Sequence, residues 1–139
     1  STIKTRKEDK VNTPHIPISW GELFDKITIL EIKLENLKTK SAIRNVKTEH
    51  GQLCKILERN FSENKNAKRL MIDLKLINQK LWDIEDSIRD KERSKTFDED
   101  FIELARKVYF TNDDRSRIKR NINETLGSEL IEEKSYADY

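Results

Sequence analysis

The spacing of apolar residues between Leu70 and Ile88 constrains the fold of this chain more than any other feature. Successive apolar positions lie alternately four and three residues apart, at Leu70, Leu74, Ile77, Leu81, Ile84 and Ile88. This heptad pattern is typical of a helix that packs along its length against other helices. It predicts one long helix from about Ala67 to Arg93. A face of this length needs cover from neighbouring helices or from a second copy of the chain.

Two further helical patterns precede the long helix. The first stripe consists of Leu23, Ile27, Leu30, Leu34 and Leu37. Ser19 and Glu22 form an S-x-x-E capping box in front of this stripe, so a helix is expected from Trp20 to about Lys40. A second helix is expected over roughly residues 41–61, where apolar residues repeat at similar spacing.

Two short helices are expected after the long one. Asp98 offers an N-cap for a helix that continues to Tyr109, and Asn112 offers an N-cap for another that ends at Gly127. Residues 128–139 are expected to pack back along the bundle as an extended tail. With 3 Gly and 2 Pro, the chain lacks the turn formers of a many-stranded β fold. The sequence predicts an all-α bundle of about five helices: two or three long antiparallel helices, short C-terminal helices and the tail.

The length of 139 residues fits one domain with a single hydrophobic core. We expect a flexible N-terminal arm over residues 1–16 and one helical domain over residues 17–139. No apolar run approaches the roughly 20 residues needed to cross a bilayer, and the arm lacks the apolar centre of a signal peptide. A cytoplasmic protein without membrane contact is therefore expected.

Standard catalytic and metal-binding motifs are absent from the sequence. There is no Gly-rich phosphate loop, no H-E-x-x-H and no G-x-S-x-G. Cys54 is the only cysteine, and His15 and His50 are the only histidines, so no ligand pair has metal-binding spacing. We therefore expect neither a metal nor a cofactor, and we interpret the neighbouring His50 and Cys54 as structural. Whether the chain is an enzyme stays open at this point.

The charge of the chain argues against a nucleic-acid partner. The 28 Lys and Arg residues are balanced by 26 Asp and Glu, which leaves a net charge of +2 rather than a polycation. The most basic segment, RSRIKR at residues 115–120, is flanked by Asp113, Asp114 and Glu124. Regularly spaced aromatic residues that could stack on bases are also missing.

Charged residues beside the apolar stripes indicate an anion-binding site at one corner of the bundle, where the C-terminal helices would meet the long helix. If the connection near Asn112 packs over the end of the long helix that carries Glu85 and Arg89, several cations and carboxylates converge on one pocket. The candidate ligand-binding residues are Glu22, Asp25, Lys26, Glu85, Arg89, Arg106, Tyr109, Asn112, Arg115, Lys119, Lys134 and Tyr136. The alternative interpretation is a set of ordinary ion pairs on helix surfaces.

Three regions of the sequence resemble a known family. They are PISWGELFDKITILEIKLENLK at residues 17–38, LWDIEDSIRDKE at 81–92, and FIELARKVYFTNDDRSRIKRNIN at 101–123 with GSELIEEKSY at 127–136. Over most of residues 17–139 the chain resembles a family of small bacterial and phage proteins known as a domain of unknown function. Phe24 stands where we expect an aliphatic residue in this family. The resemblance implies a link to sugar transfer and surface polysaccharides, but no defined activity.

Two classes of function follow from these features. The leading hypothesis is a non-catalytic binding or adaptor domain whose charged corner engages an anionic small molecule or a partner protein, linked to sugar or surface-polysaccharide metabolism. The alternative is a small all-helical enzyme that acts on a phosphorylated or carboxylated, sugar-linked metabolite. The long heptad stripes also predict a homodimer built on the long helices.

Overall fold

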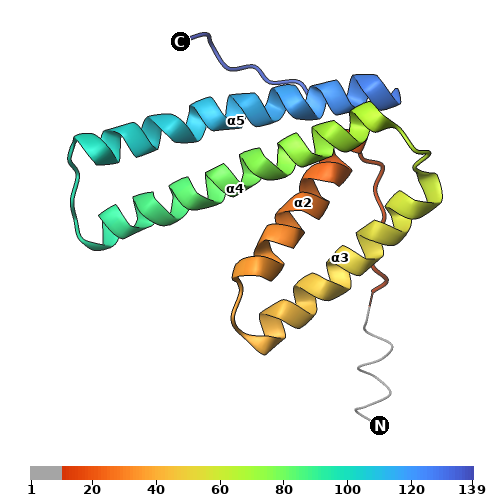
Figure 1. Cartoon of the computed structure of the whole chain (residues 1–139), viewed down its shortest axis with the longest axis horizontal. Helices are drawn as coiled ribbons and strands as arrows, with labels where there is room; N and C mark the ends of the chain where they lie inside the picture. Colours follow the sequence, from red (N-terminus) through yellow and green to blue (C-terminus); the bar gives the residue numbers. More distant parts are fainter. Residues whose placement is uncertain (1–10) are drawn as a thin grey trace.

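The computed structural model describes residues 11–139 and contains four helices in that range (Figure 1). They are α2 (Trp20–Asn36), α3 (Lys40–Asn60), α4 (Lys65–Arg93) and α5 (Glu99–Leu126). An extended tail, residues 128–139, follows α5. No strand is present between residues 11 and 139, so the prediction of an all-helical fold is confirmed. Within the same range, no helix combines the length and the apolarity that crossing a membrane requires.

Side-chain caps mark where three of the four described helices begin, whereas α3 begins after Thr39 without a side-chain cap. The Ser19 side chain accepts a hydrogen bond from the Glu22 N–H at the start of α2. Asn64 and Asp98 accept in the same way at the starts of α4 and α5. Each cap satisfies an N–H group that has no partner inside its own helix. At the other end of α5, Gly127 adopts φ +65°, a left-handed conformation that glycine adopts without a Cβ clash.

The helices form two antiparallel hairpins, α2–α3 and α4–α5, and α2 joins them (Figure 1). Helix α2 packs against α3, α4 and α5, whereas α3 packs against α2 and against no other helix of the described chain. The central position of α2 explains why it buries residues all around its axis, including the polar Asp25 and Thr28.

The core lies where α2 crosses the α4–α5 hairpin. Phe24, Ala67, Leu74 and Ile122 are fully buried there. The Trp20, Phe24 and Phe61 rings pack against one another with centroids 5.9–6.2 Å apart beside this cluster. Helix α4 packs against α5 and α2, and within its heptad stripe Leu74 and Ile84 are buried while the other four residues are half-buried, so the chain covers much of this stripe with its own helices. The stripe by itself therefore no longer requires a second copy of the chain.

Helix α5 corrects the prediction of two short C-terminal helices. It continues through Asn112, which was expected to cap a separate fifth helix. The helix continues because its packed stripe has no break: Leu104, Val108, Thr111, Arg115, Ile118 and Ile122 keep the alternating spacing of four and three. The polar Thr111 is only 2% exposed within this stripe. The weak helix propensity of Asn and Asp costs less than about 1 kcal/mol per residue, which packing along α4 outweighs.

Candidate functional site

The site forms where α2 approaches α5 at Gly21. The Gly21 N–H donates to Asn123 Oδ1 at 2.7 Å, and the Trp20 N–H donates to Ser128 Oγ at 3.0 Å. A Cβ atom on Gly21 would lie 2.5 Å from the backbone oxygen of Lys119, so only glycine permits this approach. The first N–H groups of α2 are thus capped by residues from the end of α5, which places the first turns of α2 beside α5.

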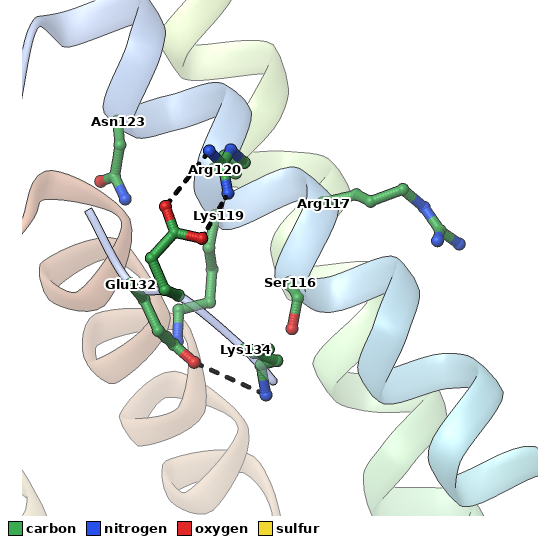
Figure 2. Close-up of a pocket in the computed structure, with 8 residues that line it drawn as sticks. Ser116, Arg117, Lys119, Arg120, Asn123, Glu132 and Lys134 are labelled. Carbon is green, nitrogen blue, oxygen red and sulfur yellow. Dashed lines mark hydrogen bonds and ion pairs between the residues drawn. The ribbon is translucent and has the colours of Figure 1, made fainter. Parts of the chain in front are cut away.

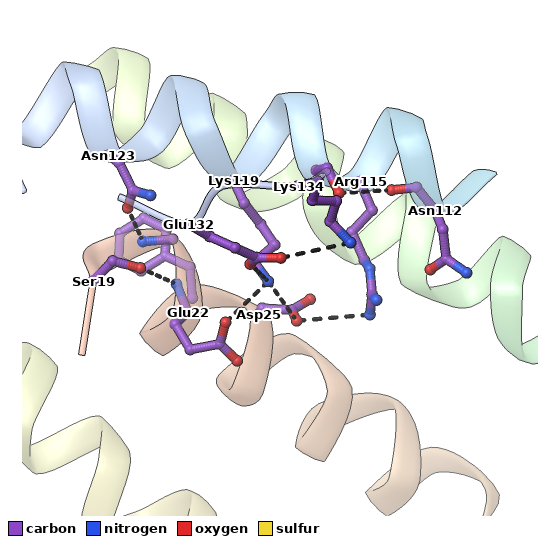
Figure 3. A network of polar contacts seen from close by, with 12 residues as sticks. Ser19, Glu22, Asp25, Asn112, Arg115, Lys119, Asn123, Glu132 and Lys134 are labelled. Carbon is purple, nitrogen blue, oxygen red and sulfur yellow. Dashed lines mark hydrogen bonds and ion pairs between the residues drawn. The ribbon is translucent and has the colours of Figure 1, made fainter. Parts of the chain in front are cut away.

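Asp25 is a buried carboxylate at the centre of this contact. It is 5% exposed, and its Oδ1 accepts a hydrogen bond from Asn78 Nδ2 of α4 at 2.9 Å. Its Oδ2 lies 3.6 Å from both Arg115 and Lys119 of α5. Asn78 also donates to Thr28 Oγ1 at 3.1 Å. Both carboxylate oxygens are therefore compensated by donors or cations, as burial of a charge requires. Figure 3 shows the pairs that Asp25 forms with Arg115 and Lys119.

Lys119 connects three segments of the chain. Its Nζ lies 2.9 Å from Glu22 of α2, 3.6 Å from Asp25 and 3.1 Å from Glu132 of the tail. Burial of Lys119 lowers its pKa, but hydrogen bonds to Glu22 and Glu132 and the charge of Asp25 outweigh this effect, so the pKa lies above its ordinary value. The hydrogen bond from Lys119 in turn holds the pKa of Glu132 below its usual range, although burial acts in the opposite direction. Both shifts favour the charged forms of Lys119 and Glu132, so the ion pair between these two residues is present near neutral pH.

A small cavity of about 210 Å³ lies between α5 and the tail (Figure 2). Its lining comprises Ser116, Arg117, Lys119, Arg120, Asn123, Glu132, Glu133 and Lys134. Arg120 lies 3.4 Å from both carboxylate oxygens of Glu133, and Lys134 lies 3.5 Å from Glu132. Four cations and two carboxylates line this cavity, and three of the cations also pair with carboxylates outside it: Arg117 with Asp114, Lys119 with Glu22 and Arg120 with Glu124.

Five of the residues predicted from the sequence meet in this region. Glu22, Asp25, Arg115, Lys119 and Lys134 lie within one network of ion pairs (Figure 3). A sixth, Asn112, lies one turn before Ser116, and its backbone oxygen accepts a hydrogen bond from the Ser116 hydroxyl.

The other predicted residues lie elsewhere. Glu85 and Arg89 pair with each other at 3.3 Å on α4. Arg106 pairs with Glu103 and lies over the ring of Phe110.

The aromatic candidates and one lysine are also outside the network. Tyr109 packs against Phe110 and against Tyr139 at the far end of the tail. Tyr136 is 78% exposed, with Lys134 above its ring. Lys26 lies in a separate groove between α2 and α3.

The expected convergence of the α5 cations over Glu85 and Arg89 is therefore wrong. It required a turn near Asn112 that would fold Arg106 back towards Arg115. In one continuous helix these two residues are about 13 Å apart along the axis. The structure thus concentrates the candidate site at the crossing of α2 and α5.

Three residues of the cluster were missed as site residues. Asn78 lies four residues after Leu74 and three before Leu81, so a polar residue at heptad spacing was a usable signal. Asn123 and Glu132 belong to the segments that resemble the known family, but Gly21 lies 102 residues from Asn123, and Lys119 lies on a different element from Glu132, 13 residues before it. Periodicity within one helix contains no information about such partners.

The surroundings of Cys54 do not favour its thiolate form. Cys54 Sγ and Glu31 Oε2 both lie 3.5 Å from the same His50 nitrogen, Nε2. Burial raises the pKa of the Cys54 thiol, and the charges of Glu31 and Glu58 add to this effect. A raised pKa favours the thiol over the nucleophilic thiolate. Among residues 11–139, no group of three or more His, Cys, Asp or Glu side chains could hold a metal ion.

Fold and site define a class of protein: a small helical domain in which two helix hairpins and a tail enclose a network of ion pairs. The chain belongs to DUF6165, a family of unknown function, whose pattern matches residues 14–139. The prediction that the chain belongs to a family of unknown function is thereby confirmed. No curated protein and no solved structure matches the chain.

Proposed function

We propose that this chain is a non-catalytic binding domain that holds an anionic group in the cavity between α5 and the tail. The observation that carries the proposal is the lining of this cavity, where four cations meet in about 210 Å³ and the tail carboxylates Glu132 and Glu133 already bind three of them. This volume is below the roughly 300–1,000 Å³ of pockets that enclose a drug-sized ligand. It suits a single phosphate or carboxylate group, with the rest of the ligand or partner protein outside.

The tail supports a preference for carboxylate or phosphate oxygens. Glu132 contacts Lys119, and both oxygens of Glu133 face the Arg120 guanidinium. A guanidinium matches the two oxygens of a carboxylate or phosphate with parallel donors. In this proposal, the anionic group of the ligand takes the place of one tail carboxylate.

The buried part of the network favours binding over catalysis. Both oxygens of Asp25 are occupied, one by Asn78 and the other by two cations. A general base needs a free lone pair within reach of a substrate proton. We therefore infer that Asp25 holds the helices together, whereas the cations at the cavity bind the ligand.

The test compares two arginines with matched local surroundings. Arg120 lies at the cavity and pairs with Glu124 four residues on, whereas Arg89 lies outside it and pairs with Glu85 four residues before. Purified wild-type, Arg120→Gln and Arg89→Gln proteins are titrated with glucose 1-phosphate and with inorganic phosphate by calorimetry. Glucose 1-phosphate is the first probe because the family resemblance implies a link to sugar metabolism.

We expect wild-type protein to bind the phosphate group and Arg120→Gln to bind it at least about tenfold more weakly, because a charge-assisted hydrogen bond contributes about 1.5–3 kcal/mol. Arg89→Gln should bind like the wild type. Equal losses in the two variants would contradict the proposed location. Absence of binding to both probes, with no anionic metabolite retained on the purified protein by mass spectrometry, would contradict the proposed function.

A further inference from the structure

A second and larger cavity lies on the other side of α2. It is an open groove of about 820 Å³ between the extended segment at residues 13–19, the start of α2 and the second half of α3. We call it the α2–α3 groove. Its apolar lining includes Ile16, Ile18, Trp20, Leu23, Leu53 and Ile56. Ile16 is 75% exposed and Ile56 is 41% exposed, so part of this apolar surface faces solvent.

The polar lining of the groove has one sign of charge. Lys26 of α2 and Lys55 and Arg59 of α3 line it, together with His15, and no Asp or Glu does. None of these three cations forms an ion pair with any carboxylate of residues 11–139. Lys119 and Arg115, by contrast, are balanced by carboxylates within the network on the opposite side of α2. The groove therefore presents uncompensated positive charge next to exposed apolar side chains.

We propose that the α2–α3 groove binds a small anionic amphiphile, a molecule with an apolar chain or ring and one carboxylate or phosphate head. The apolar side chains would cover the body of such a molecule, because removing apolar surface from water is favourable. Lys55 and Arg59, one helical turn apart on α3, would hold the head group. The volume lies within the range of pockets that enclose small ligands.

A free molecule fits this groove better than a membrane surface does. A helix that lies on a membrane presents a broad apolar face along its length. Here the apolar residues line a concavity formed by two helices and an extended segment. This shape encloses one chain or ring rather than resting on a sheet of lipids.

Trp20 provides the measurement, because it lines the groove and its ring packs against Phe24 and Phe61. In a Trp82→Phe background it is the only tryptophan of the chain. Its fluorescence is titrated with decanoate, with 1-decanol and with acetate, all below the concentration at which decanoate forms micelles. Decanol has the apolar chain of decanoate without its carboxylate, and acetate has the carboxylate without the long apolar chain. These two probes therefore separate the contributions of the two parts of the ligand.

Two double variants of α3 test the role of the cations. Lys55→Gln with Arg59→Gln removes two charges at the groove, and Arg44→Gln with Lys47→Gln removes two exposed charges outside it. Because none of the four side chains has an ion-pair partner in the described chain, both variants should keep the wild-type melting temperature.

We expect saturable binding of decanoate, binding of decanol at least about tenfold weaker, and no response to acetate. The groove variant should bind decanoate about tenfold more weakly than the control variant. Equal affinities of the two variants would overturn the proposal, as would the absence of saturation. A protein that binds vesicles of phosphatidylglycerol but not dispersed decanoate would overturn it in favour of a membrane surface.

Discussion

Replacing Gly21 by alanine tests the contact between α2 and α5 that assembles the candidate site. The added Cβ would lie 2.5 Å from the Lys119 backbone oxygen, 3.1 Å from the Lys119 carbonyl carbon and 2.9 Å from Asn123 Oδ1. Two of these atoms are backbone of a long helix, which cannot move aside as a flexible side chain can. The two helices must therefore separate locally.

The expected loss of stability follows from three contributions. Overpacking of a tight contact costs typically about 1–3 kcal/mol. Weakening the hydrogen bond from Gly21 to Asn123 adds about 1 kcal/mol. The better helix propensity of alanine returns at most about 1 kcal/mol. The net effect is a loss of about 1–3 kcal/mol, which lowers the melting temperature of a chain of this size by roughly 4–12 °C.

Gly51 provides the matched control for this substitution. It lies within α3, and a Cβ placed there meets no atom within 4 Å. Gly51→Ala should therefore raise the free energy of unfolding by about 0.5–1 kcal/mol through helix propensity alone. Both variants are compared with the wild type by urea unfolding followed by circular dichroism. If Gly21→Ala were as stable as Gly51→Ala, the close approach of α2 and α5 would be refuted.

Three further substitutions or treatments probe the same architecture. Asp25→Ala should lower the free energy of unfolding, measured in urea, by about 3 kcal/mol because it leaves buried donors and cations uncompensated. Glu85→Ala removes one partner of an exposed pair and should lower it by less than about 1 kcal/mol. Similar losses in the two variants would contradict the assignment of Asp25 to a buried network. Because Lys119 lowers the pKa of Glu132 below its ordinary 4.5, the contribution of Glu132 to stability is present above about pH 4.5 and is lost as the pH falls through the lower pKa of the folded state. The difference in melting temperature between wild type and Glu132→Gln should therefore be constant near neutral pH and shrink in acid, and a difference that grew in acid would refute the ion pair. Chelator and reductant should leave the circular dichroism and the melting temperature unchanged, since Cys54 is the only cysteine, and a drop of several degrees with chelator would reveal a carboxylate metal site.

Local patterns in the sequence are enough to predict where most of the described helices begin and end. The long helix was predicted over 67–93 and is found at Lys65–Arg93, and the one predicted over 41–61 is found at Lys40–Asn60. The capping residues Ser19 and Asp98 and the terminal Gly127 act as their positions in the sequence indicate. These features are local, because a cap or an apolar stripe depends on residues within a few turns of one another.

How the helices pair and which charged residues meet depends on packing between segments that are far apart in the sequence. The helix break expected at Asn112 disappears because packing along α4 holds Thr111 and its neighbours in one continuous stripe. The hydrogen bond between Gly21 and Asn123 joins residues 102 positions apart in the sequence, and the hydrogen bond between Asn78 and Asp25 joins residues 53 positions apart. Such contacts depend on which helix faces lie opposite each other after the core has packed. No periodicity within a single helix encodes them, because it specifies that a face is buried but not which face covers it.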